Sequence, residues 1–345
     1  MKIIVQIPCF NEAETLPGVI AEMPRSAAGI DQVEVLVIDD GSTDGTADLA
    51  LRLGVEHVVR HRRNRGLAAA FQTGIETCLH LGADVIVNTD GDNQYAGEDI
   101  PRLIAPILRG GADVVIGDRR PADLPHFSRG KRLLQAFGSA VVRRLSRTDV
   151  PDAVSGFRAF SRDAALQLNL VNSFSHTIET VMQIGDRRLA VVSVPIQARR
   201  VERRSRLFQN VPQFLRRSAT VLIRSHLMYH PLQVLTFIGL SITAVGLVPI
   251  VRFVYFFATD GGQGHIQSLV LGSALLCIGF MTLVLGLLAD LIASNRRLIE
   301  LTLEKVRRIE LGTETSREPD RAERTHTSAN DGNGRAQIAE VRSRL

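Results

Sequence analysis

Two carboxylates one residue apart, Asp90 and Asp92, are well suited to bind a divalent cation. They follow a largely apolar, β-branched-rich run at 85–88, which predicts a buried strand. In open α/β sheets, ligands bind just beyond the carboxyl ends of the parallel strands. Mg²⁺ or Mn²⁺ held by one or two carboxylates takes its other ligands from water and phosphate, and Gln94 offers a neutral oxygen. An isolated Asp-Gly-Asp would indicate only a solvated turn, but the strand before it favours a metal site.

A second acidic pair, Asp39-Asp40, follows another apolar run at 33–38. A carboxylate at the end of a strand can bind a nucleoside through its base or ribose. The alternative is helix capping by Ser42, Thr43 or Asp44, which accounts for Asp44 but not for two adjacent carboxylates. Neither a GxGxxG nor a GxxxxGK[ST] motif occurs, so phosphates must be held by a metal and basic side chains.

The elements that must position these carboxylates alternate along the chain. Short β-rich runs are predicted at 2–7, 33–38, 56–60, 85–88, 113–116 and 189–194, with helical patterns between most of them. Such alternation predicts an α/β fold with right-handed βαβ units and a mostly parallel sheet.

The composition favours a membrane over nucleic acid as the partner of this basic chain. The 345 residues carry a net charge of +5, and Arg and Lys cluster just before and after two long apolar runs. There is no Trp and no recognisable nucleic-acid-binding module. The three cysteines form no CxxC and are interpreted as reduced thiols.

The two apolar runs, at about 232–257 and 266–292, each exceed the roughly 20 residues that a helix needs to cross a bilayer. A basic amphipathic stretch from residue 199 precedes them, and more basic residues follow them, so the positive-inside rule places both flanks in the cytoplasm. The apolar run at 3–7 is too short for a signal peptide. The predicted parts are an α/β domain (1–200), interface helices (201–230), two transmembrane helices (231–293), a helical extension (294–311) and a disordered tail (312–345).

Six motifs in order resemble one family: Pro8-Cys9-Phe10-Asn11-Glu12, Asp39-Asp40-Gly41-Ser42-Thr43-Asp44-Gly45, Asn64-Arg65-Gly66, Asp90-Gly91-Asp92, Gly117-Asp118-Arg119 and Ser155-Gly156-Phe157-Arg158. Over residues 1–206 the chain resembles the family 2 glycosyltransferases with a GT-A fold. Within them it is most similar to the polyprenyl-phosphate (dolichol-phosphate mannose synthase-like) transferases, some of which carry a membrane hairpin.

The resemblance implies roles for particular side chains. The implied nucleotide pocket contains Pro8, Phe10, Glu12, Asp39, Asp40 and Asp90. The implied metal site contains Asp90, Asp92 and Gln94. The acceptor phosphate would contact Arg119, Arg203, Ser205 and Arg206, where Arg206 stands in place of the family's usual lysine. The residues expected to carry the reaction are Asp92, Arg119, Arg158 and Glu179.

Simpler interpretations stand beside some of these roles. The basic stretch at 199–206 would also be attracted to anionic headgroups, and Arg158 could be a surface arginine. His176 and Glu179 share one helical face, and for His176 a pairing with a neighbouring side chain is favoured over sugar contact.

The expected function is inverting, metal-dependent transfer of a hexose from a nucleotide sugar to a polyprenyl phosphate at the cytoplasmic membrane face. GDP-mannose is the leading donor, and UDP-glucose is the alternative. A phosphate acceptor is already anionic and needs no general base, whereas a hydroxyl acceptor would need a carboxylate, for which Glu179 is the candidate. A non-catalytic nucleotide-sugar-binding scaffold is the alternative from another class, and the sequence leaves homo-oligomerisation open.

Overall fold

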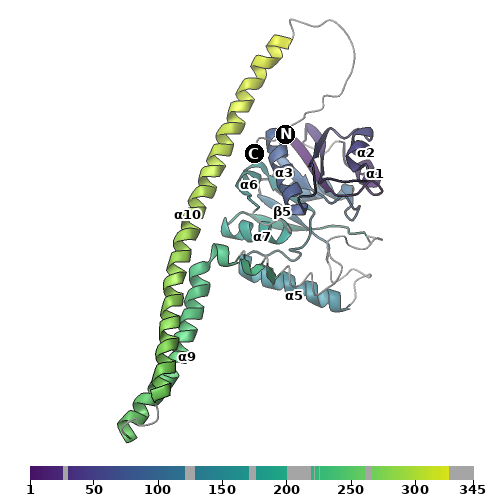
Figure 1. The fold of residues 1–345 in the computed structure, drawn as a ribbon. Coiled ribbons are helices and arrows are strands. Elements are labelled where there is room, and N and C mark those ends of the chain that lie inside the picture. The colour runs from purple at the N-terminus through teal and green to yellow at the C-terminus, as the bar shows by residue number, and fades with distance from the viewer. Residues whose placement is uncertain are drawn as a thin grey trace. The chain divides into compact units, whose positions relative to one another are not determined.

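A seven-stranded sheet with the order β3-β2-β1-β4-β6-β5-β7 forms the centre of the N-terminal domain (Figure 1). The computed structural model describes residues 1–25, 30–120, 129–170, 176–199, 219–220, 222–224, 226–260 and 266–325, without the side chains of 129–137, 260 and 313–325. The strands are β1 (Lys2–Cys9), β2 (Gln32–Asp39), β3 (His57–Arg60), β4 (Val85–Asn88), β5 (Val114–Asp118), β6 (Arg158–Ser161) and β7 (Val191–Pro195).

All pairings in the sheet are parallel except those of β6, which runs antiparallel between β4 and β5. The prediction of a mostly parallel sheet is confirmed. β1 pairs with β2 on one side and β4 on the other, so the direction of strand succession reverses at the β1–β4 boundary. Such a switch point leaves a crevice beyond the carboxyl ends of the strands, where ligands bind in open sheets.

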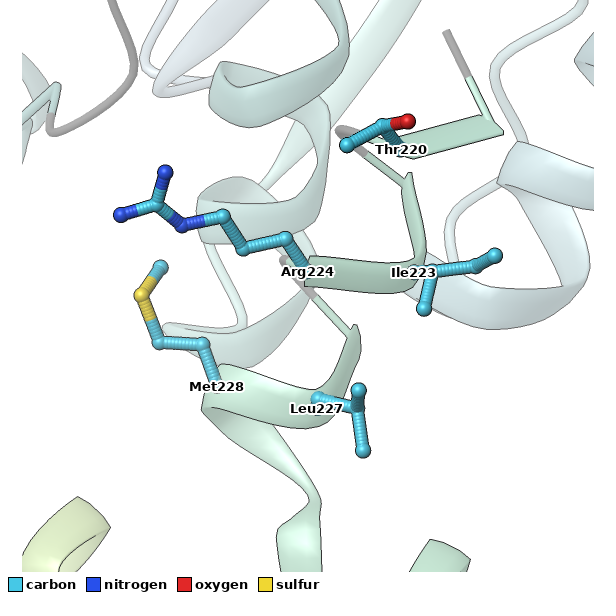
Figure 2. A pocket seen from close by; sticks show the side chains of 5 residues that line it. All are labelled: Thr220, Ile223, Arg224, Leu227 and Met228. Carbon is cyan, nitrogen blue, oxygen red and sulfur yellow. The ribbon is translucent and has the colours of Figure 1, made fainter. Parts of the chain in front are cut away.

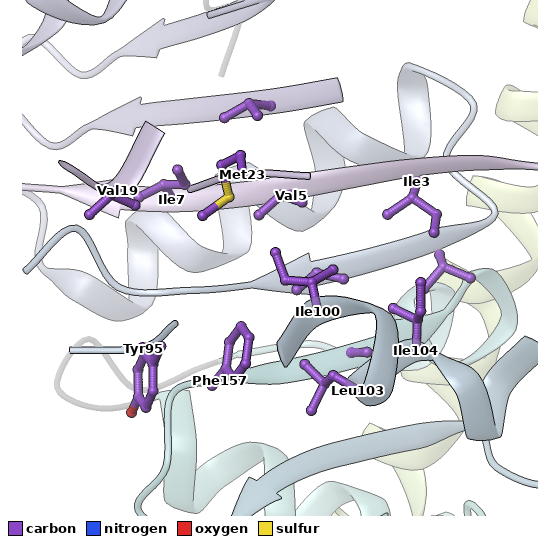
Figure 3. Packing of buried hydrophobic residues seen from close by; sticks show 14 of the residues in the cluster. Ile3, Val5, Ile7, Val19, Met23, Tyr95, Ile100, Leu103, Ile104 and Phe157 are labelled. Atoms are coloured by element: carbon purple, nitrogen blue, oxygen red, sulfur yellow. The ribbon is translucent and has the colours of Figure 1, made fainter. Parts of the chain in front are cut away.

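Strand alternation sends side chains to two different helical layers. Ile3, Val5 and Ile7 of β1 belong to a core cluster with residues of α1 (Leu16–Ala21) and α4 (Ile100–Leu108) (Figure 3). The intervening Gln6 lies on the other face, against Gly74 of α3 (Leu67–His80). The remaining helices of this domain are α2 (Thr46–Arg52), η1 (Gly97–Asp99), α5 (Arg129–Ser146), α6 (Arg162–Gln167) and α7 (His176–Asp186).

A hairpin of two long helices, α9 (Pro231–Asp260) and α10 (Ile266–Thr325), follows (Figure 1). Glycines set how closely the helices approach: a Cβ on Gly272 would lie 2.9 Å from the carbonyl oxygen of Gly246, and one on Gly279 would lie 3.0 Å from that of Gly239. Large apolar side chains such as Phe237 face outward instead. By length and composition, both helices are able to cross a membrane.

The structure differs from the sequence-based expectation at two places. α10 continues as a helix to Thr325, past the predicted end at 311. α6 was not predicted, although Ser161 caps it by accepting a hydrogen bond from the Ala164 amide at 3.2 Å. Most of the predicted interface helices (201–230) lie outside the described residues, which include helical positions at 222–224 and 226–229.

Candidate active site

Five strands bring the predicted site residues to one edge of the sheet. Asp39 ends β2, Asp90 follows β4, and Arg119 follows β5, and these three strands run in the same direction. Because β6 runs the opposite way, its first residue, Arg158, lies at this same edge, in register with Asn88 and Ile116. Glu12 follows β1 and is buried there. The sheet therefore gathers residues that are far apart in sequence.

The loop after β4 has the character expected of a cation site. Burial, together with the neighbouring charge of Asp92, raises the pKa of Asp90 to about 7, against the opposing effect of Arg119. One oxygen of Asp92 accepts a hydrogen bond from the Gln94 amide at 3.1 Å, which turns the loop. Two neighbouring carboxylates that repel each other fit a divalent cation, which would relieve the repulsion.

The chain offers this cation few further protein ligands. Among the described residues, no group of three or more His, Cys, Asp or Glu side chains is arranged to hold a metal. Mg²⁺ or Mn²⁺ bound by Asp90 and Asp92, with Gln94 nearby, would therefore take its remaining ligands from water and a substrate phosphate. Such a site is suited to binding a phosphate-containing substrate rather than to a purely structural metal.

Arg119 is held in place by a residue that sequence reasoning missed. Its Nε and Nη2 donate to the two carboxylate oxygens of Asp152 at 2.7 and 2.9 Å, so the pair is bidentate. Asp152 is fully buried, and Arg119 is nearly so. Asp152 lies three residues before the Ser155-Gly156 motif, and that proximity was the signal available in the sequence.

Arg158 is an internal residue, so its interpretation as a surface arginine is wrong. Its side chain is 0% exposed, with Nε donating to the Ser155 carbonyl at 2.8 Å, Nη2 to that of Ala153 at 2.9 Å, and Nη1 to the Thr180 hydroxyl. Burial lowers its pKa to about 10, so it remains charged at neutral pH. Arg158 thus ties the loop before β6 to α7 and places a fixed positive charge near Asp90.

The two residues of the Asp39-Asp40 pair have different environments. Asp39 accepts from the Ser42 amide at 2.9 Å through Oδ1, while Oδ2 accepts no hydrogen bond from the described residues and has only the Arg60 Nε at 3.4 Å. Asp40 instead accepts from the amides of Arg65 at 2.9 Å and Gly66 at 2.8 Å, and its Oδ1 lies 2.7 Å from His61 Nδ1. Asp40 therefore holds the Asn64-Arg65-Gly66 loop, and Asp39 has the oxygen suited to a ligand.

The first motif packs against the second. The Asn11 amide donates to Ser42 Oγ at 2.8 Å, and Asn11 Oδ1 accepts from the Thr43 amide at 2.9 Å. Pro8 is buried in β1, whereas Phe10 is 37% exposed beyond the end of the strand. An exposed aromatic ring beside Asp39 is suited to contact with a planar base.

The α7 helix holds Glu179 and His176 inside the domain. Glu179 is 0% exposed. The His176 ring stacks on Phe71 at 4.3 Å between centroids, and burial lowers its pKa to about 3, so the ring is neutral. Neither ring nitrogen has a hydrogen-bond partner among the described residues. The neighbouring side chain that was expected to pair with His176 is thus Phe71, and the contact between them is ring stacking.

The basic stretch begins with an arginine that contacts the loop after β4, which carries Asp90 and Asp92. The Arg199 amide donates to the Gln94 carbonyl at 2.9 Å, and its Nη1 donates to Glu22 at 2.6 Å and Asn93 at 3.2 Å. Arg203, Ser205 and Arg206 lie outside the described residues.

An open pocket of about 560 Å³ lies before α9. Its described lining is Thr220, Ile223, Arg224, Leu227 and Met228 (Figure 2). The mixture of apolar side chains with one arginine suits an amphipathic ligand with an anionic group.

Comparison with known proteins agrees with this arrangement. A family model described as glycosyl transferase family 2 matches residues 4–168. Over 206 residues the chain is 31% identical to an undecaprenyl-phosphate mannosyltransferase of Micrococcus luteus, covering 57% of this chain and 83% of that protein. It is 32% identical over 206 residues to a polyprenol monophosphomannose synthase of Mycolicibacterium smegmatis, covering 56% and 76% of the two chains.

A solved structure shows the same fold. Glucosyl-3-phosphoglycerate synthase of Mycobacterium tuberculosis, crystallised with Mn²⁺ and UDP-glucose, superposes with a TM-score of 0.50 at 24% identity, over 66% of this chain and 78% of that one. The expected GT-A fold is confirmed. With acidic and basic side chains gathered at one edge of such a sheet, and with relatives that match over most of their own length, the chain is a glycosyltransferase that belongs to family 2.

Proposed function

We propose that this glycosyltransferase transfers mannose from GDP-mannose to a polyprenyl phosphate, with inversion at the anomeric carbon and with Mg²⁺ or Mn²⁺ bound at Asp90 and Asp92. The observation that carries the proposal is that these two carboxylates follow β4 at the same sheet edge as Arg119, whose charge acts on Asp90, in a chain that continues into two long apolar helices. The two named relatives that match over most of their length are both described as mannose transferases acting with a polyprenyl carrier.

The donor would bind with its base near Asp39 and Phe10 and its diphosphate near Asp90, Asp92 and Gln94. Asp39 Oδ2, which accepts no hydrogen bond from the described residues, can accept one from a base or ribose donor. The bound cation supplies Lewis-acid stabilisation of the negative charge that develops on the leaving diphosphate. Arg158 adds a permanent positive charge that solvent cannot screen, since it is fully buried.

The acceptor phosphate is anionic at neutral pH, so no side chain has to remove a proton from it. The task left to the protein is alignment, and Arg119 is held for that purpose because Asp152 fixes two of its three guanidinium nitrogens. Glu179, fully buried in α7, is then not required as a base.

The lipid chain of the acceptor would approach from the membrane hairpin. The apolar pocket around Arg224 offers a basic group among apolar side chains just before α9. Basic segments flank both outer ends of the hairpin in the sequence, which supports a cytoplasmic position for the catalytic domain and the C-terminal tail at the cell membrane.

Transfer of radiolabelled sugar into organic-extractable lipid tests the proposal. Membranes containing the chain would receive GDP-mannose or UDP-glucose, polyprenyl phosphate, and either Mg²⁺ or EDTA. We expect EDTA-sensitive label in the lipid phase with GDP-mannose. Label with UDP-glucose alone would replace the donor assignment, and label that persists in EDTA would contradict the metal assignment.

A further inference from the structure

Gly156 is held by side chains from both sides of the metal-binding loop. Its amide donates to the hydroxyl oxygen of Tyr95 at 3.0 Å, and its carbonyl accepts from Asn88 Nδ2 at 2.8 Å. Asn88 is the last residue of β4, two positions before Asp90, and Tyr95 follows Asp92 by three. Residues on both sides of the two carboxylates therefore hydrogen-bond to the backbone of this one glycine.

The backbone of Gly156 lies directly against Asp90. A Cβ at this position would lie 2.8 Å from Oδ2 and 2.9 Å from Oδ1 of Asp90, closer than side-chain carbons are found. The position of Gly156 thus limits where the Asp90 carboxylate can lie. A shift of this backbone towards the loop would displace a proposed metal ligand.

Gly156 also belongs to the segment that orients the two arginines. Asp152 of this segment holds Arg119, and the carbonyls of Ala153 and Ser155 accept from Arg158. Gly156 consequently sets the spacing between the carboxylates on one side and the arginines on the other. That spacing matters for a reaction in which a diphosphate must contact both groups.

The surroundings of Tyr95 fix its hydroxyl in position to accept the hydrogen bond from Gly156. Its ring is 4% exposed and stacks on Phe157 with centroids 5.1 Å apart and planes 11° apart (Figure 3). Burial raises the pKa of Tyr95, so the hydroxyl stays neutral. Asn88 is equally constrained, because its Oδ1 accepts from Gln6 Nε2 at 2.9 Å, which directs Nδ2 to Gly156.

We propose that Tyr95 is a positioning residue of the transfer reaction, whose hydroxyl holds Gly156 against Asp90 and keeps the metal-binding loop in register with the arginine-bearing segment. This inference rests on the proposed function for its catalytic consequence. Its structural part concerns only Tyr95, Gly156 and Asp90.

The test compares Tyr95→Phe, which removes only the hydroxyl, with Phe157→Leu, which removes the stacked ring but keeps the hydroxyl. The full chain in detergent or liposomes would be assayed for lipid-linked label across a Mn²⁺ titration, for kcat and KM of the donor, and for thermal unfolding. For Tyr95→Phe we expect the Mn²⁺ concentration for half-maximal activity to rise about tenfold, the size of effect given by one lost buried hydrogen bond. We expect kcat to fall at saturating Mn²⁺.

The matched variant separates positioning from packing. Phe157→Leu is expected to have the lower unfolding temperature of the two, because it leaves a cavity in the core, while its Mn²⁺ requirement stays at the wild-type value. A wild-type Mn²⁺ requirement and kcat in Tyr95→Phe would overturn the proposal. The same shift in both variants would also overturn it, because the Mn²⁺ requirement would then respond to any disturbance of this region and not specifically to the Tyr95 hydroxyl.

A binding measurement distinguishes failure of the Tyr95 proposal from failure of the proposed function. If the wild-type chain transfers no sugar from either donor, the proposed function fails, and Mn²⁺ binding to the same three proteins is measured by calorimetry. Weaker binding by Tyr95→Phe alone supports the inference. Equal binding by all three proteins, or none by the wild type, overturns it.

Discussion

The sheet edge buries charged side chains, whereas the helical hairpin buries glycines and exposes large apolar side chains. At the sheet edge, the charged residues Arg158 and Asp152 are each 0% exposed. In the hairpin, the helices touch through glycines, and large apolar side chains such as Phe237, 75% exposed, face outward. The difference is the one expected if the hairpin crosses a membrane, as proposed. Water selects an apolar interior with a few paired charges, whereas lipid leaves only close packing to hold helices together.

The same comparison shows where side chains must be positioned accurately. Charges at the sheet edge are oriented by bidentate and backbone hydrogen bonds, so small displacements change the electrostatics of the site. The outer surface of the hairpin would have no such requirement in a membrane, because any apolar side chain is compatible with lipid. Substitutions should therefore affect chemistry at the first region and assembly at the second.

The largest effect is expected for Asp92→Ala. Loss of one of the two carboxylates proposed to bind the metal should lower lipid-linked transfer about thousandfold, since a Lewis acid contributes several kcal/mol to charge stabilisation. The radiolabel assay measures this, with Asp48→Ala on the exposed surface of α2 as the control. Near wild-type transfer by Asp92→Ala would remove the active site from this edge of the sheet.

Arg158→Met should chiefly destabilise the catalytic domain. The variant leaves the carbonyls of Ala153 and Ser155 buried without their donor, which we expect to lower the free energy of unfolding by about 3 kcal/mol. Chemical denaturation followed by circular dichroism measures the change. The exposed Arg109→Met is the control, and equal stability of both variants would show that the internal charge does not orient this segment.

Gly246→Leu tests the hairpin in the same way. A Cβ there would lie 2.8 Å from the Leu275 Cβ, so the two helices must separate, at a cost of about 2 kcal/mol. The SDS concentration at which helical structure begins to unfold should be lower for this variant. The control Val248→Leu, at an outward-facing position, should leave that concentration unchanged. Equal behaviour of the two variants would mean that the glycine contacts do not hold the hairpin.

The smallest effect is expected at the exposed contact between Arg199 and Glu22. The arginine side chain is 42% exposed, so its ion pair should contribute less than about 1 kcal/mol, and transfer by Arg199→Gln should stay within about threefold of wild type. A double-mutant cycle with Glu22→Gln measures the coupling. A coupling much above 1 kcal/mol would show that this surface contact supports the metal-binding loop as strongly as a buried one.

Sequence reasoning succeeded where a local pattern has one physical meaning. The apolar runs at 33–38 and 85–88 became β2 and β4, because short, continuous apolar runs rich in β-branched residues are typical of buried parallel strands. The acidic pairs after them lie at the same sheet edge because parallel strands end together. The two long apolar runs likewise became α9 and α10.

Sequence reasoning was less informative where the role of a side chain depends on its partners in the folded protein. Asp39 and Asp40 are identical neighbours in the sequence, yet Asp40 holds a loop through two amides and Asp39 keeps one oxygen without a hydrogen bond among the described residues. The sequence left open whether Arg158 lies at the surface, since burial of an arginine requires acceptors contributed by distant segments such as α7.

By itself, the sequence determined the order of strands and helices, the acidic residues at the strand ends and the two apolar segments, because these follow from periodicity and local composition. Only the tertiary structure decided that β6 enters the sheet antiparallel, that Asp152 holds Arg119, and that Gly156 lies against Asp90 between Asn88 and Tyr95. Those contacts join residues more than 30 positions apart, and their geometry is set by the packing of the whole sheet rather than by any one stretch of chain.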